Sequence, residues 1–72
     1  MVKKLQRVRQ EQGLSLKNLA DNIGVHPTSI NYWEHGKRNP KSVNVMMLEE
    51  ELGKPIDFLL EEDNDNDRTK HR

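Results

Sequence analysis

The chain has 72 residues, no cysteine and a hydrophobic content of 32%, so it can form one small domain without a disulfide framework or a Cys-based zinc site. Its 12 basic and 12 acidic residues are unevenly placed, because residues 1–41 carry eight basic and three acidic residues and residues 42–72 carry four and nine. No apolar run reaches membrane-spanning length, and the basic half is typical either of a surface that faces a polyanion or of ordinary solvated charge.

The first two predicted elements are amphipathic helices. Within residues 2–12, Val2, Leu5 and Val8 are apolar at three-residue spacing, and Gly13 ends this segment. Residues 15–24 have apolar residues at the i, i+3, i+4, i+7 spacing of one helix face. Ser15 can cap this second helix and Gly24 can end it.

Three further segments complete an all-α fold of five helices. The third runs through residues 26–36 and has Pro27 at its first helical position, where a missing N–H costs nothing. A fourth helix is predicted over residues 42–53, and a short fifth one over residues 55–60. Residues 61–72 contain no apolar side chain, so we expect a disordered polar tail after a folded body of residues 1–60.

The second and third helices are separated by only Gly24-Val25-His26. A turn of this length that contains glycine sets two helices at a steep angle and projects the second one outward. The outward positions of that helix are short or polar, as is needed to meet base edges in a major groove. They are Pro27, Thr28, Asn31 and Tyr32.

A series of residues extends this motif in register into the flanking helices. It comprises Arg9, Gly13-Leu14-Ser15, Leu19-Ala20, Ile23-Gly24-Val25, Ile30, Trp33-Glu34, Gly36-Lys37-Arg38, Pro40, Leu48, Leu52-Gly53, Ile56-Asp57 and Leu59-Leu60. With these residues the chain resembles the phage-repressor and Cro-like helix-turn-helix regulators of the XRE family. The resemblance covers residues 5–60 and implies a sequence-specific DNA-binding transcriptional regulator, and most simply a repressor.

The resemblance also implies roles for individual residues. The recognition helix would run from about Pro27 to Glu34 and read a double-stranded operator with Pro27, Thr28, Asn31 and Tyr32. Asn31 could bond adenine at two points, and the methyl group of Thr28 could touch a thymine methyl. Arg9 and Glu34 match a family pair that forms a structural ion pair between the first helix and the recognition helix. The implied phosphate contacts are Ser15, Lys17, Lys37, Arg38, Asn39 and Lys41.

Four positions depart from the family pattern. Leu16 stands where many relatives have a glutamine that contacts phosphate, Glu49 where they have a small alanine, Lys54 where they have valine, and Phe58 where the residue is normally polar. Because of Leu16 the glutamine contact to phosphate is missing, and we expect Lys17 to replace it. Glu49 puts the packing of the fourth helix in doubt.

A homodimer is expected from apolar residues that lie off the core stripe of the fourth helix. A single domain of this size covers about half of an operator, and two copies would place their recognition helices in successive major grooves. Phe58, the only phenylalanine, is expected to be an exposed aromatic residue on the fifth segment. The predicted interface consists of Met46, Met47, Phe58 and Leu60.

Other functional classes have less support. No Ser, His and acid grouping or glycine-rich phosphate loop occurs, so we expect no enzyme, no cofactor and no small-molecule substrate. His26, His35 and His71 lack metal-ligand spacing, and Trp33 is more typical of a core residue than of a base-stacking one. We expect a cytoplasmic protein without a membrane contact. The alternative function is a protein-interaction module, such as an antitoxin-like subunit, built on the same fold.

Overall fold

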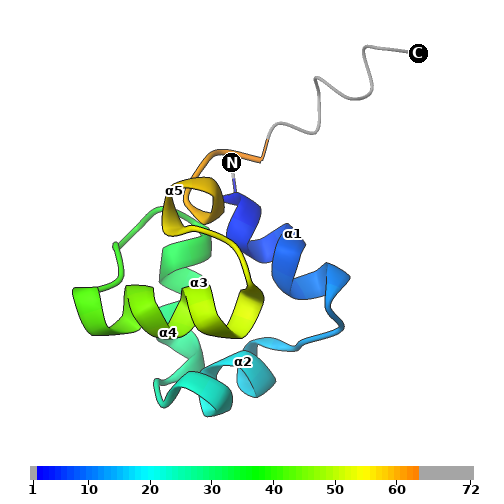
Figure 1. Ribbon diagram of the computed structural model, residues 1–72, viewed down its shortest axis with the longest axis vertical. Helices are drawn as coiled ribbons and strands as arrows, with labels where there is room; N and C mark the ends of the chain where they lie inside the picture. The colour runs from blue at the N-terminus through cyan, green and yellow to red at the C-terminus, as the bar shows by residue number, and fades with distance from the viewer. Residues whose placement is uncertain (1, 64–72) are drawn as a thin grey trace.

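The computed structural model describes residues 2–63 and shows five helices (Figure 1). They are α1 (Lys4–Glu11), α2 (Leu16–Ile23), α3 (Pro27–Glu34), α4 (Ser42–Leu52) and α5 (Ile56–Leu59). Each helix lies within the segment predicted for it, so the all-α prediction is confirmed. The described residues add one isolated antiparallel β-bridge, between Lys3 and Glu62. None of the helices in this range has the length and apolar character needed to cross a membrane.

One fully buried aliphatic residue from each helix forms the centre of the core. Around this centre lie five further buried side chains, including Trp33, which is 5% exposed and therefore belongs to the core as expected. Complete burial of one such side chain contributes about 1.5–3 kcal/mol, so the five central residues hold all five helices on one core. These residues are Leu5, Leu19, Ile30, Leu48 and Leu59.

The helices pack in an arrangement that leaves one side of α3 free. Helix α2 packs against α3 and α4, while α1 packs against α3 and α5. In Figure 1, α4 crosses in front of α3, α2 closes the bottom of the molecule and α5 lies near the start of α1 at the top. Helix α3 is therefore held by its neighbours along its core-facing side.

The packed body extends past Leu60 to Asp63. The main-chain N–H of Lys4 donates to the carbonyl of Glu61 at 2.8 Å, and the N–H of Asp63 donates to the carbonyl of Val2 at 2.9 Å. The side chain of Asp63 is buried. The boundary expected at Leu60 is therefore three residues short of the packing seen here, and residues 64–72 of the predicted tail lie outside the described residues.

Candidate nucleic-acid interface

The turn between α2 and α3 fixes the direction in which α3 leaves the core. Gly24 and Val25 both donate their N–H groups to the carbonyl of Ala20, at 2.8 and 3.0 Å. Gly24 has φ +77°, a left-handed conformation that glycine adopts without a steric penalty. Ala20 is fully buried below this turn. The chain can thus reverse within three residues and send α3 off at a steep angle.

Side chains cap the starts of both helices of this motif. Ser15 accepts from the N–H of Asn18 at 2.9 Å, and the amide oxygen of Asn18 accepts from the N–H of Ser15 at 3.4 Å. At the start of α3, Nδ1 of His26 accepts from the N–H of Thr28 at 3.1 Å. These bonds satisfy donors that a helix N-terminus leaves open.

The four predicted base-reading residues share one side of α3. Thr28 is exposed and Pro27, Asn31 and Tyr32 are half-buried, whereas Ile30, Trp33 and Glu34 are buried on the other side. We call the four residues the α3 ridge. Their side chains include a hydroxyl, an amide and a phenol, which can donate to or accept from base edges.

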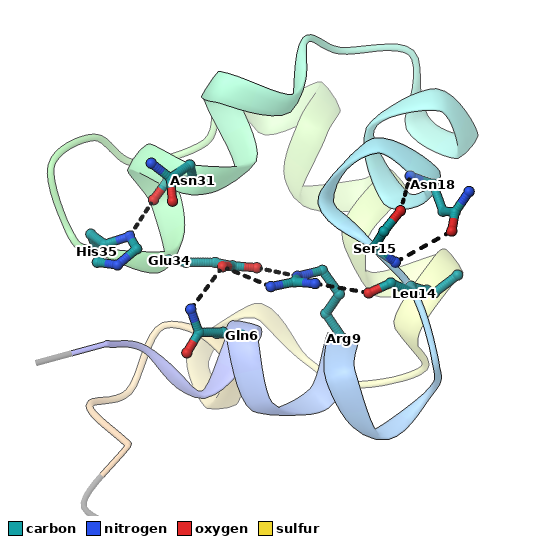
Figure 2. A network of polar contacts seen from close by, with 8 residues as sticks. All are labelled: Gln6, Arg9, Leu14, Ser15, Asn18, Asn31, Glu34 and His35. Atoms are coloured by element: carbon teal, nitrogen blue, oxygen red, sulfur yellow. Dashed lines mark hydrogen bonds and ion pairs between the residues drawn. The ribbon is translucent and has the colours of Figure 1, made fainter.

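Within the ridge, the amide of Asn31 is uncommitted. Its main-chain carbonyl lies 2.9 Å from Nδ1 of His35, and no partner of its side-chain amide occurs among residues 2–63. Figure 2 shows this amide pointing away from the ion pair between Arg9 and Glu34. Both its donor and its acceptor are therefore available to a ligand.

Tyr32 joins the α3 ridge to the loop that follows it. The guanidinium carbon of Arg38 lies 5.5 Å from the centroid of the Tyr32 ring, within the range of a cation–π contact. The N–H of Lys37 donates to the carbonyl of Tyr32 at 2.9 Å. Both the ring and the main-chain carbonyl of Tyr32 therefore contact this loop.

Within residues 2–41, the basic side chains that form no ion pair with another described residue all lie in the loop of residues 37–41. Of the eight basic residues in 1–41, five form ion pairs within the described part of the chain: Lys3, Lys4, Arg7, Arg9 and Lys17. The other three, Lys37, Arg38 and Lys41, are exposed and form no ion pair there, and Asn39 between them is also exposed. The sequence-level excess of charge is therefore concentrated in one loop.

The two phosphate contacts predicted at the start of α2, Ser15 and Lys17, already have partners within the protein. The hydroxyl oxygen of Ser15 already accepts the capping bond, although its O–H can still donate. Lys17 pairs with Asp21 at 2.9 Å, with side chains that are 75% and 60% exposed. Such a pair contributes at most about 1 kcal/mol, so Lys17 can exchange its carboxylate for a phosphate.

A buried ion pair fixes the other end of α3. Nε of Arg9 lies 2.6 Å from Oε2 of Glu34, and a second guanidinium nitrogen donates to Oε1 at 3.3 Å. Arg9 also donates to the carbonyl of Leu14 at 2.8 Å, and Gln6 donates to Glu34 at 3.4 Å (Figure 2). Glu34 is fully buried and Arg9 is 7% exposed. The structure thus pairs the residues that the resemblance implied, and α1 holds the end of α3.

The residues predicted for a dimer interface differ in exposure. Met46 is 64% exposed, as is its neighbour Val43, whereas Met47 is half-buried and packs on the core. Leu60 is also half-buried. The expectation of an exposed Phe58 was wrong, because its half-buried ring packs on the core between two lysines. Nζ of Lys4 and of Lys54 lie 4.8 and 5.7 Å from its centroid.

Two departures from the family pattern have structural roles that the sequence did not indicate. Oε2 of Glu49 accepts from the N–H of Ile56 at 2.7 Å, so it binds a donor that the start of α5 leaves open. Lys54 covers one face of Phe58. Leu16 packs against the core. Only tertiary structure brings Glu49 and Lys54 to their partners, and the sequence carried no signal for these two contacts.

A comparison with protein families agrees with this geometry. A family model described as helix-turn-helix matches residues 5–59, a range that includes the whole of α2 to α5 and nearly all of α1. No curated protein matches the chain. The family match and the geometry of the turn point to the same motif.

Proposed function

Because the chain belongs to the Cro-like XRE family of helix-turn-helix transcriptional regulators, we propose that this DNA-binding protein is a repressor. It reads a double-stranded operator in the major groove with α3, and it acts in the cytoplasm as a homodimer. The family match supports DNA binding and regulation, and the following observations support the finer assignment.

The contact between Arg38 and Tyr32 is the observation that carries the proposal. It sets a basic loop without acidic partners at the edge of the α3 ridge. A major-groove reader needs both parts side by side, since phosphate contacts fix the register and base contacts read the sequence. The same arrangement would have little use on a surface that meets a neutral protein.

We assign the α3 ridge to the bases and the basic loop to the phosphates. Asn31 offers the donor and acceptor that match adenine, and Thr28 offers a methyl group to thymine. Pro27 and Tyr32 line the same groove. The proposed phosphate contacts are Lys37, Arg38, Asn39 and Lys41 on one side, with Ser15 and Lys17 at the start of α2 on the other.

The homodimer is proposed to use the exposed apolar pair Val43 and Met46, together with the half-buried Met47 and Leu60. Phe58 contributes at most to the edge of this proposed interface, because Lys4 and Lys54 cover its ring. Two copies related by a two-fold axis would read successive major grooves about 34 Å apart. A contact this small implies weak association in the absence of DNA.

A protein-interaction module is the second candidate, and the exposure of Val43 and Met46 is the observation that favours it. A salt series separates the two functions, because neutralising phosphates gives a steep dependence of log K on log salt and pairing with a protein through apolar residues does not.

Selection of binding sites from random DNA tests the proposal. A repressor of this design should enrich a two-fold sequence and bind it with an affinity that falls steeply with salt. Absence of enrichment, together with salt-insensitive weak binding to duplex DNA, would contradict the operator-reading function.

A further inference from the structure

Residues 61–63, here the acidic segment, lie along the start of α1 in contacts that the proposed DNA interface does not use. Each carboxylate of the segment meets a different basic residue of the N-terminal region. The pairs are Lys3 with Glu62 at 2.8 Å, Lys4 with Glu61 at 2.6 Å and Arg7 with Asp63 at 3.3 Å. Together with the main-chain bonds described above, they fasten the segment to the N-terminal region.

Lys3 is the basic residue of this cluster that also touches the recognition helix. Its main-chain N–H donates to the carbonyl of Glu34, the last residue of α3, at 2.7 Å. Its aliphatic stem passes beside Gly36, where an added Cβ would lie 3.1 Å from Cε of Lys3. Lys3 is therefore placed between Glu62 on one side and the end of α3 on the other.

Lys4 and Glu61 form a comparable ion pair, but Lys4 contacts α5 and not α3. The side chains of Lys3 and Lys4 are 21% and 22% exposed, and those of Glu62 and Glu61 are 54% and 55% exposed. Nζ of Lys4 lies over the ring of Phe58, which belongs to α5. Two ion pairs of the same type and exposure thus connect the acidic segment to different helices.

We propose that Lys3 is a positioning residue for DNA recognition and that Glu62 holds it in place. With its ammonium group fixed by Glu62, Lys3 keeps its N–H on the carbonyl of Glu34 and its stem on Gly36. The phosphate-binding loop begins at that point, so the acidic segment restricts how far Lys37 and Arg38 can move. The effect on DNA rests on the proposed function, whereas the effect on the end of α3 is a property of the free protein.

Amide hydrogen exchange in the free protein tests the second effect directly. The reporters are the N–H of His35, bonded to Asn31 at 3.1 Å, and that of Lys37, bonded to Tyr32 at 2.9 Å. Glu62→Gln should speed their exchange roughly two- to fivefold, the range that loss of one partly exposed ion pair supports. Glu61→Gln removes the same charge from the same segment and should leave these two amides unchanged.

A second variant distinguishes positioning from a general loss of stability. Lys3→Met keeps the aliphatic stem and removes the charge, so it should reproduce the effect of Glu62→Gln and add nothing to it in the double variant. Affinity for duplex DNA should fall by a similar factor in both variants and stay unchanged in Glu61→Gln.

Equal acceleration in Glu61→Gln and Glu62→Gln, or none in either, would overturn the role of Lys3. Additive effects of Lys3→Met and Glu62→Gln would overturn it as well. If the wild-type protein bound no DNA, the proposed function would fail, and the exchange rates of His35 and Lys37 would still decide the positioning role.

Discussion

Nε of Arg9 lies 2.6 Å from Oε2 of Glu34, in a pair that is almost closed to solvent. The two residues belong to α1 and α3, so the first helix holds the end of α3 by a charge-assisted bond. Loss of one partner would leave the other charge in a site from which water is excluded.

We therefore predict that Glu34→Gln lowers the free energy of unfolding by about 3–5 kcal/mol, the cost of leaving a buried charge without its partner. Urea denaturation measures this change. Lys17→Ala is the control, because it breaks an exposed pair and should change stability by less than about 1 kcal/mol. Equal effects of the two substitutions would show that the buried pair does not hold α1 to α3.

A second prediction concerns pH and Glu62. The hydrogen bond from Lys3 lowers the pKa of this carboxyl from its ordinary value of 4.5, and the nearby lysine charge acts in the same direction. Because the folded state has the lower pKa, the stabilising contribution is present above pH 4.5 and is lost as the pH falls through the lowered value. Unfolding measured against pH should show this loss in the wild type.

The variant Glu62→Gln is the control for that titration. It has no carboxyl to protonate at this position, so its stability should fall less than that of the wild type over the same acidic range. Identical pH profiles of the two proteins would contradict the assigned contribution of the pair between Lys3 and Glu62.

A third prediction tests the cap that Glu49 provides for α5. Glu49→Ala leaves the N–H of Ile56 without its carboxylate partner and should cost about 1 kcal/mol, as loss of a helix cap does. Glu50→Ala on the exposed side of the same helix should change stability by less than about 0.5 kcal/mol. Thermal unfolding of both variants measures these changes in stability. A larger loss of stability in Glu50→Ala than in Glu49→Ala would refute the role of Glu49 as a cap.

A fourth prediction tests the proposed homodimer. Met46→Asp places a charge in the exposed pair Val43 and Met46, so it should abolish cooperative binding to a two-fold site and leave half-site binding intact. Sedimentation with and without operator DNA measures the assembly. A 2:1 complex that forms equally well with Met46→Asp would place the interface elsewhere.

Much of this fold could be predicted from the sequence because local signals decide it. The spacing of Leu19, Ala20 and Ile23 gave the buried face of α2, and Ser15 and Gly24 gave its ends. Helical period and capping involve residues a few positions apart, so one sequence is enough to show them. The pairing of Arg9 with Glu34 came from the family resemblance, since no local rule joins residues 25 positions apart.

The errors concern contacts between distant segments. Residues 61–63 are entirely acidic, and their composition predicted that the tail begins at residue 61. In the structure, however, they form ion pairs with lysine and arginine side chains 56 to 59 positions earlier in the chain. Phe58 was expected to be exposed because its covering residue Lys4 lies on another helix. Periodicity shows which residues share a face, but it does not show which side chain of another helix covers that face.

The proposed division of labour, in which the α3 ridge reads bases and the loop after it holds phosphates, can be tested by comparing operator DNA with random DNA. Asn31→Ala should cost about 1–3 kcal/mol in binding free energy on the selected operator and little on random DNA. Arg38→Ala should weaken binding to both and reduce the salt slope by about one. An equal loss for Asn31→Ala on operator and random DNA would contradict the account.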